Sequence, residues 1–102
     1  MDHQESIETI RIFEIREGIS YEQIDGCFFI LNTNDGEYYE LNSSSSYIWS
    51  QLIEGKNNLK VILDEVNKNY TASNLITTHV GSLLKELELL GLIREIEIEK
   101  NK

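Results

Sequence analysis

Cysteine is almost absent from this sequence: Cys27 is the single one among 102 residues. One cysteine excludes a disulfide within the chain, and the N-terminus lacks the basic start and apolar run of a secretory signal. No apolar stretch approaches the ~18 residues that would span a bilayer. We therefore expect a cytoplasmic protein that is not integrated into a membrane.

Histidine is nearly as scarce, with His3 and His79 as the two examples. Neither has a second histidine or a cysteine at ligand spacing, so no metal site is predicted. Cys27 lies in the apolar run Cys-Phe-Phe-Ile-Leu, where a free cysteine usually behaves as a small hydrophobic side chain. The glycines are scattered and form no phosphate-binding loop. The sequence predicts no cofactor and no enzymatic activity.

Basic residues are scarce in the first 42 residues, which contain ten acidic side chains and only two arginines, Arg11 and Arg16. This half carries −8 of the formal net charge of −9. Such a surface repels phosphate backbones, which disfavours nucleic-acid partners. A solvated acidic face explains the charge without any partner, and attraction of a cationic partner to this half is the alternative.

The first part of the chain has the alternation of β-strands. Residues 1–8 are polar, and we expect a flexible N-terminus there. From residue 9, Ile10, Ile12 and the more distant Tyr21 alternate with charged residues, as in a half-buried strand. Gly18 interrupts this run, which is therefore either two short strands or one strand with a bulge or turn.

Two turn signals divide the next strands. Asp25-Gly26 precedes Cys27–Leu31, a run too apolar for one solvated face, so we expect it to be covered on both faces. Asp35-Gly36 then separates it from a third strand, Glu37–Leu41. The prediction is a three-stranded antiparallel meander.

Beyond Asn42 the apolar residues recur at helical spacing. Asn42 or one of the serines at 43–46 can accept a hydrogen bond from a first-turn N–H, so the serine run is interpreted as a cap rather than a flexible linker. Trp49 is expected to anchor the core. Three helices are predicted from their apolar faces, the first with Tyr47, Ile48, Leu52 and Ile53 before Gly55. The second has its apolar face at Leu59, Ile62, Leu63 and Val66 and ends near Asn69-Tyr70. The third runs from about Leu75 to Leu90, with an apolar face at Ile76, Val80, Leu83, Leu84, Leu87 and Leu90.

The end of the chain is less regular. Gly81 inside the third helix costs about 1 kcal/mol relative to alanine and indicates either close packing or tolerance. Gly91 is the expected residue after the helix end. Leu92–Ile98 alternates like a strand or an extended tail. We take residues 9–94 as the domain and residues 95–102 as a loose C-terminal tail.

This order predicts an α+β fold, winged-helix-like, with a three-stranded antiparallel sheet followed by three helices. A winged-helix DNA-binding regulator is one functional alternative. The third helix, however, carries Lys85 beside Glu86 and Glu88 and has no arginine, whereas a recognition helix needs several cations. A small structural subunit that pairs through its sheet edge is another alternative.

One pattern runs through the chain: Tyr39-Glu40-Leu41-Asn42, Ile48-Trp49, Leu52, Gly55 and Leu87-x-x-Leu90-Gly91-Leu92-Ile93. In this order the residues resemble the PqqD family, over about residues 10 to 94. The resemblance covers PqqD proper and lasso-peptide-type recognition proteins alike. It implies three strands followed by three helices that bind, without catalysis, the leader segment of a ribosomally synthesised precursor peptide. The leader would dock as an added strand on the third strand, beside the third helix, and be delivered to a modifying enzyme such as a radical-SAM protein or a cyclase or protease.

A peptide-binding site follows from this resemblance and from strand chemistry. An outer strand of a meander offers unpaired N–H and C=O groups, and alternation places Tyr38 and Tyr39 on opposite faces. A second stripe on the third helix is either the opposite wall of a groove or an ordinary boundary between core and solvent. The predicted site residues are Glu37, Tyr38, Tyr39, Glu40, Leu41, Leu75, His79, Ser82 and Glu86. Their carboxylates would favour a cationic peptide.

Overall fold

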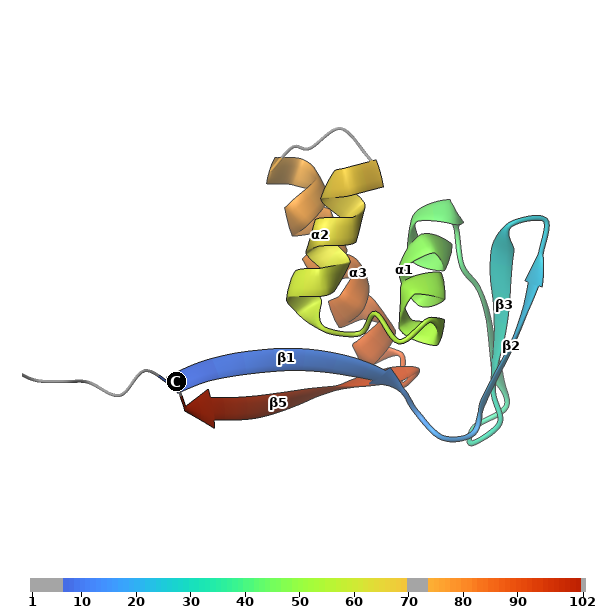
Figure 1. Cartoon of the computed structure of the whole chain (residues 1–102). Helices are drawn as coiled ribbons and strands as arrows, with labels where there is room; N and C mark the ends of the chain where they lie inside the picture. Colours follow the sequence, from blue (N-terminus) through green and yellow to red (C-terminus); the bar gives the residue numbers. More distant parts are fainter. Residues whose placement is uncertain (1–6, 70–73, 102) are drawn as a thin grey trace, which may run out of the picture.

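The described part of the chain forms five strands and three helices (Figure 1). The computed structural model describes residues 7–69 and 74–101, with side chains described for 9–68 and 79–99. In chain order the elements are β1 (Ile7–Ile15), β2 (Ile19–Ile24), β3 (Cys27–Asn32), β4 (Glu37–Glu40), α1 (Ser43–Ile53), α2 (Leu59–Asn69), α3 (Asn74–Leu89) and β5 (Ile93–Asn101). The predicted α+β class is confirmed.

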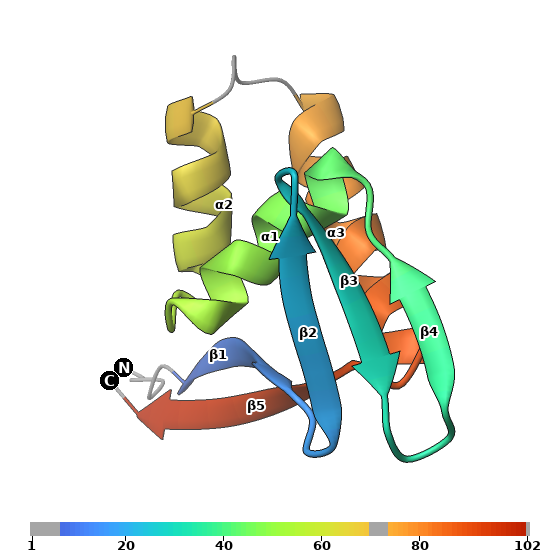
Figure 2. The ribbon, with the colours of Figure 1, turned by 90° about the vertical axis from the view of Figure 1, so that its right-hand side faces the viewer.

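The strands form two sheets, both antiparallel. One has the order β2-β3-β4, so the predicted three-stranded meander is confirmed, and the other is the ribbon β1-β5 (Figure 2). Gly18 lies in the turn where the chain passes from one sheet to the other, with φ at +84°. Of the two possibilities for residues 9–24, two short strands or one interrupted strand, two separate strands are therefore correct.

The expected flexible ends are wrong where the structure describes them. Ile7 and Glu8 already belong to β1, and residues 95–101 belong to β5 rather than to a loose tail. The two strands pair along their whole length, from Ile7 opposite Asn101 to Ile15 opposite Ile93. This pairing satisfies backbone groups that a tail would leave to water. Residues 1–6 and 102 lie outside the described residues.

Ion pairs support the ribbon from both faces. Arg11 donates from Nε and Nη2 to the two carboxylate oxygens of Glu95, and Arg94 Nη2 lies 3.0 Å from Glu14 Oε2. The hydrogen bond from Arg11 lowers the pKa of Glu95, although partial burial opposes it. Each pair joins β1 to β5, so both help to hold the C-terminal strand in place.

Helix α1 lies between the three-stranded sheet and the other helices (Figures 1 and 2). It contacts β3 on one side and α3 on the other. Asn42 is its N-cap and accepts a hydrogen bond from Ser45 N–H at 2.9 Å, so the serines form its first turn. Trp49 is fully buried, as predicted for a core anchor. At the end of α3, Gly91 adopts φ +79°, the left-handed conformation expected after a helix end.

The apolar strand β3 is covered on one face only. Phe28, Ile30 and Asn32 are buried, whereas Cys27, Phe29 and Leu31 are partly exposed. The expectation of two covered faces is therefore wrong, because all three helices lie on the same side of this sheet (Figure 1).

Gly81 has no neighbouring atom within 4 Å of an ideal Cβ position, so it is tolerated rather than required by close packing. None of the helices in the described ranges is long and apolar enough to cross a membrane. Helix α2 ends at Asn69, and Tyr70 lies outside the described residues.

Candidate functional site

Strand β4 is an outer strand of its sheet, and backbone hydrogen bonds fix which of its residues face the free edge. Opposite residues of an antiparallel pair alternate between bonded and non-bonded positions. Leu41 N–H donates to the Phe28 carbonyl at 2.9 Å, so Leu41 and Phe28 are a bonded pair. Two residues back in the register, Tyr39 and Ile30 are then the next bonded pair. Tyr38 and Glu40 are therefore the residues whose N–H and C=O groups point away from β3. Among the described residues, no strand pairs with them.

The side chains of β4 divide between the two faces of the sheet. Tyr38 is 69% exposed on the outer face, whereas Tyr39 packs against the core. Desolvation raises the pKa of Tyr39, and the charges of Asp35 and Glu37 raise it further. Leu41 is 6% exposed and belongs to the core. Its side chain is thus not available at the edge, although it was among the predicted site residues.

Ser46 anchors the end of β4 to α1. Its hydroxyl accepts a hydrogen bond from Phe28 N–H at 2.9 Å and donates to the Leu41 carbonyl at 3.3 Å. The hydroxyl therefore stands between the two strands at the position where the ladder ends. Ser46 is buried, although its place in the serine run predicts only a role in the helix cap.

Helix α3 lies on the same side of the sheet as the other two helices and passes behind β3 and β4 in the view of Figure 2. Just after its C-terminal end, a Cβ at Gly91 would lie 3.9 Å from the side-chain amide nitrogen of Asn32, and Asn32 stands opposite Glu37 at the start of β4. Near its N-terminal end, His79 lines a cavity together with Ser44 of α1. Helix α3 is therefore on the inner side of the strand whose outer edge is free.

Three residues of the predicted stripe lie in the part of α3 whose side chains the structure describes. His79, Ser82 and Glu86 are all exposed, so they are accessible to a ligand. The backbone of Leu75 belongs to α3, but its side chain lies outside the described residues. The structure therefore brings three of the four predicted helix residues to one exposed row.

A small apolar cavity opens beside this row. It has a volume of about 110 Å³ and lies between the three helices. Its lining residues are Ser44, Tyr47, Ile48, Val66, His79, Val80 and Leu83. Sequence reasoning assigned most of these to the core and named only His79 for the site. The helical period does place His79 beside Val80 and Leu83, but it does not say that a cavity opens there.

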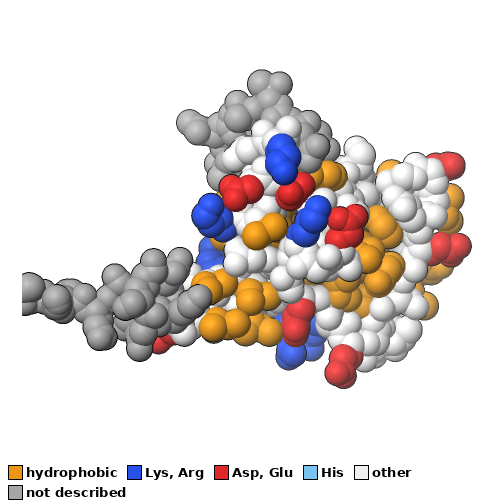
Figure 3. Space-filling view, viewed as in Figure 1, with side chains coloured by type: hydrophobic (Ala, Val, Ile, Leu, Met, Phe, Trp, Pro, Cys, Tyr) orange, Lys and Arg blue, Asp and Glu red, His pale blue; other side chains and the backbone are white. Residues whose placement is uncertain are grey.

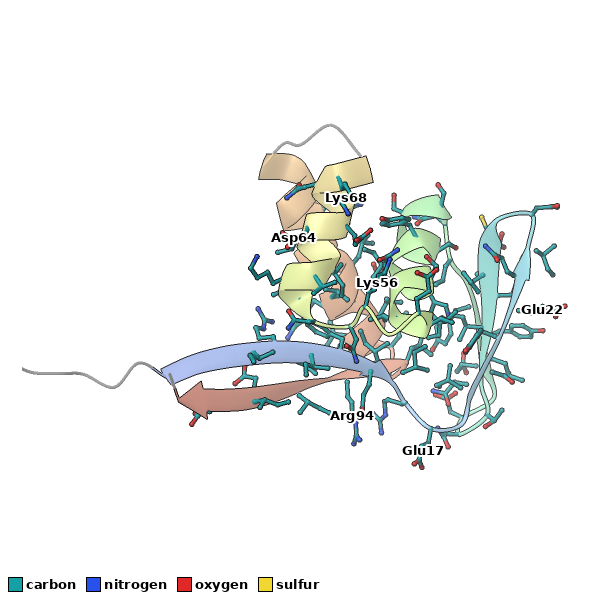
Figure 4. The ribbon with its side chains drawn as sticks, viewed as in Figure 1. Glu17, Glu22, Lys56, Asp64, Lys68 and Arg94 are labelled. Atoms are coloured by element: carbon teal, nitrogen blue, oxygen red, sulfur yellow. The ribbon has the colours of Figure 1, made fainter. Side chains whose placement is uncertain are left out.

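Charge is divided sharply between the sheet and the helices. From Ile19 to Asn42 there is no lysine, arginine or histidine. The acidic residues in that segment are Glu22, Asp25, Asp35, Glu37 and Glu40. Figure 3 shows basic side chains over α2 and the ribbon, and acidic ones on the strands at the right. In Figure 4, Lys56 and Lys68 lie near α2, on the opposite side from Glu22. The charged side chains of the segment that contains the free edge of β4 are thus all acidic.

Metal-binding chemistry is not supported by this geometry. Within the described part of the chain, no group of three or more histidine, cysteine, aspartate or glutamate side chains is placed to hold a metal ion. What the edge offers is backbone hydrogen bonding, an aromatic side chain and negative charge. These features fit an extended polypeptide.

The family model described as Coenzyme PQQ synthesis protein D (PqqD) matches residues 27–93, well over half of the chain. The chain belongs to the PqqD family. A search of curated proteins gave no match. Among solved structures, this PqqD-family chain is similar to TbiB1 in complex with the TbiA(beta) leader peptide, with 26% identity and a TM-score of 0.74 over 79% of this chain and 94% of that one. It also shares the fold of lasso peptide synthetase B1 complexed with the leader peptide, with 23% identity and a TM-score of 0.70 over 80% and 96%.

Proposed function

We propose that this PqqD-family chain binds the leader segment of a ribosomally synthesised precursor peptide as a strand added to β4. The observation that carries the proposal is the free outer edge of β4. The similarity to TbiB1, solved in complex with the TbiA(beta) leader peptide, supports leader-peptide binding. The chain itself performs no chemistry and delivers the peptide to a modifying enzyme, such as a radical-SAM protein or a cyclase or protease.

The backbone of the leader is held by Tyr38 and Glu40. Their outward N–H and C=O groups pair with alternate residues of the leader, which gives affinity without reading its sequence. The side chains of a docked strand then point alternately toward α3 and toward the outer face. The first row meets His79, Ser82 and Glu86, and the second lies beside Tyr38.

Two features give the site its specificity. The cavity of about 110 Å³ accepts one aliphatic side chain of the leader, since its lining is largely apolar. Glu37, Glu40 and Glu86 favour lysine or arginine at neighbouring leader positions. A DNA backbone is repelled by the same acidic surface.

Amide hydrogen exchange tests the docking mode residue by residue. A synthetic leader should slow exchange at Tyr38 and Glu40, whose amides are free, and leave Tyr39 and Leu41 little changed because they already bond to β3. Equal protection along the strand, or changes confined to α2, would contradict strand addition. The probe is the TbiA(beta) leader peptide, which was solved in complex with the similar TbiB1.

Two substitutions at Glu40 test whether the leader binds to the backbone edge of β4. Glu40→Pro removes an outward donor without touching the bonds between β3 and β4, since proline is accepted at strand edges. We expect it to abolish leader binding, while Glu40→Ala binds within a few-fold of the parent chain. Both should keep the parent circular dichroism spectrum. Full binding by a folded Glu40→Pro chain would rule out β4 as the docking edge.

A further inference from the structure

The three-stranded sheet has a second free edge, at β2. The two-residue turn at Asp25-Gly26 has positive φ at both positions, 52° and 82°, and such a turn closes on a bonded pair, Ile24 with Cys27. At the other end, Thr33 N–H donates to the Gly18 carbonyl at 2.9 Å, so Gly18 and Thr33 are also a bonded pair. This agrees with the alternation that starts from Ile24 and Cys27. The alternate residues of β2 therefore direct their backbone groups outward. These residues are Ile19, Tyr21 and Gln23.

This edge lacks most of the usual protection against strand pairing, and Glu22 is the one charged side chain on it. Natural edges are commonly shortened, bulged, covered, or guarded by lysine or proline. The edge of β1 is covered in this way, because Phe13 N–H donates to the Asn57 carbonyl at 2.8 Å and Ile12 bridges to Asn58. Strand β2 is six residues long, regular, and free of lysine and proline. No other strand or loop of the described residues pairs with its outward side.

We propose that β2 is a second strand-docking site, which takes an extended basic segment of a partner protein. Its residues from Ser20 to Ile24 are all exposed, so a docked strand meets side chains as well as backbone. Glu22 and Asp25 flank the edge, and no cation lies between Ile19 and Asn42. Lysine or arginine in the incoming strand is attracted there.

A second copy of this chain is the poorer occupant. Two β2 edges would bring together two sheets that each carry five acidic residues and no basic one between Ile19 and Asn42. Like charges on paired strands are destabilising. The charge of the sheet therefore selects a partner of opposite sign rather than itself.

The two edges can be occupied at the same time. Strands lie about 4.8 Å apart, so strands added to β2 and β4 would be roughly 19 Å apart in one continuous sheet. A partner held at β2 would have a peptide on β4 within reach of its own surface. The inference does not rest on leader binding, since it concerns the opposite edge. A basic strand of the modifying enzyme is the occupant with this chemistry.

Tyr21 supplies a reporter that is specific for β2. Its ring packs edge-on against Trp49, with centroids 5.7 Å apart, and against Phe28 at 6.1 Å. Trp49 is the only tryptophan, so its fluorescence responds to a strand that moves or covers Tyr21. Tyr21 is 43% exposed and lies on the edge strand.

The test uses the full chain and a blocked peptide of alternating lysine and valine as the probe. We expect a change in Trp49 fluorescence and slower exchange at the Tyr21 and Gln23 amides, by roughly tenfold when the site is about nine-tenths occupied. Gln23→Pro should remove both signals and Gln23→Ala should keep them, because position 23 makes no backbone bond to β3. The matching peptide of glutamate and valine should give neither signal.

Each alternative outcome overturns the inference. Protection only at Tyr38 and Glu40, lost in Glu40→Pro, would mean that basic strands use β4 alone. Signals that persist in a folded Gln23→Pro chain would mean that the probe binds elsewhere. Protection of β2 that appears with rising protein concentration, in the absence of probe, would make a second copy the occupant. Failure of the leader to bind β4 would leave the β2 signals unchanged, so the two proposals fail separately.

Discussion

The backbone N–H of Phe28 donates to the hydroxyl of Ser46 at 2.9 Å, and this bond joins strand β3 to helix α1. The same hydroxyl donates to the Leu41 carbonyl, so it fills the position where a direct strand-to-strand bond would otherwise close. Both groups are buried. A helix side chain therefore ends the ladder between β3 and β4, and it fixes where the free edge of β4 stops.

Ser46→Ala should lower the free energy of unfolding by about 1–3 kcal/mol, because it leaves the buried Phe28 N–H without its acceptor. Urea denaturation followed by Trp49 fluorescence measures the change. Ser43→Ala is the matched control: Ser43 is exposed in the same helical turn, and we expect a change of at most about 0.5 kcal/mol. Equal effects of the two substitutions would show that the Ser46 bridge adds no stability.

Gly81→Ala should raise the free energy of unfolding by roughly 1 kcal/mol. The position is in the interior of α3, and a new Cβ would meet no atom within 4 Å, so only the gain in helix propensity remains. Gly91→Ala should have the opposite sign and cost about 1–2 kcal/mol, because its φ of +79° is strained for alanine. Thermal unfolding of both variants checks the pair, and a destabilised Gly81→Ala chain would contradict the open environment at that site.

Lowering the pH should destabilise the β1-β5 ribbon, because Glu95 becomes protonated. The Arg11 hydrogen bond lowers the pKa of Glu95 below its ordinary 4.5. Its contribution is therefore complete above about pH 4.5 and is lost as the pH falls through the lower pKa of the folded state. Arg11 is 47% exposed, which limits the effect to about 1 kcal/mol or less. The difference in Tm between the parent chain and Glu95→Gln should shrink from about pH 6 to about pH 3, and a constant difference would contradict the pairing.

Neutralising the acidic side chains of the site should weaken the binding of a cationic leader. We expect Glu40→Gln and Glu86→Gln each to raise the Kd by roughly two- to fivefold at low salt, which corresponds to about 0.3–1 kcal/mol for a partly exposed charge pair. The effect should fade as salt screens the charges. Glu97→Gln, on the ribbon, carries the same charge change and should leave the Kd unaltered. Isothermal titration calorimetry measures all three, and a similar loss in Glu97→Gln would indicate general charge attraction.

The local elements were predictable because their signals lie within a few residues of one another. Asn42 precedes the apolar helical period and does cap α1, through a bond to Ser45 three residues on. The turns with Gly26 and Gly36 do join neighbouring strands. The outer position of β4 then follows from a meander of three consecutive strands.

Pairing over long distances was not predictable in the same way. Ile10 and Ile12 alternate in one segment, and Ile96 and Ile98 in another, but nothing local states that they stand opposite each other. Leu92–Ile98 was therefore compatible with a strand or an extended tail, and residues 95–102 were assigned to a loose tail. Likewise, the apolar residues of β3 gave no sign of which face the helices would leave open.

The sequence by itself determined the order of strands and helices, their caps and turns, and the acidic character of the strand half, because these depend on neighbouring residues and on composition. Only the tertiary structure decided that all three helices lie on one side of the three-stranded sheet, that Ser46 closes the ladder at Phe28, and that β2 is left uncovered. Those relationships join residues that are far apart in the chain. They depend on which surfaces can be buried together at the same time, and the backbone hydrogen bonds then follow from the register that this packing selects.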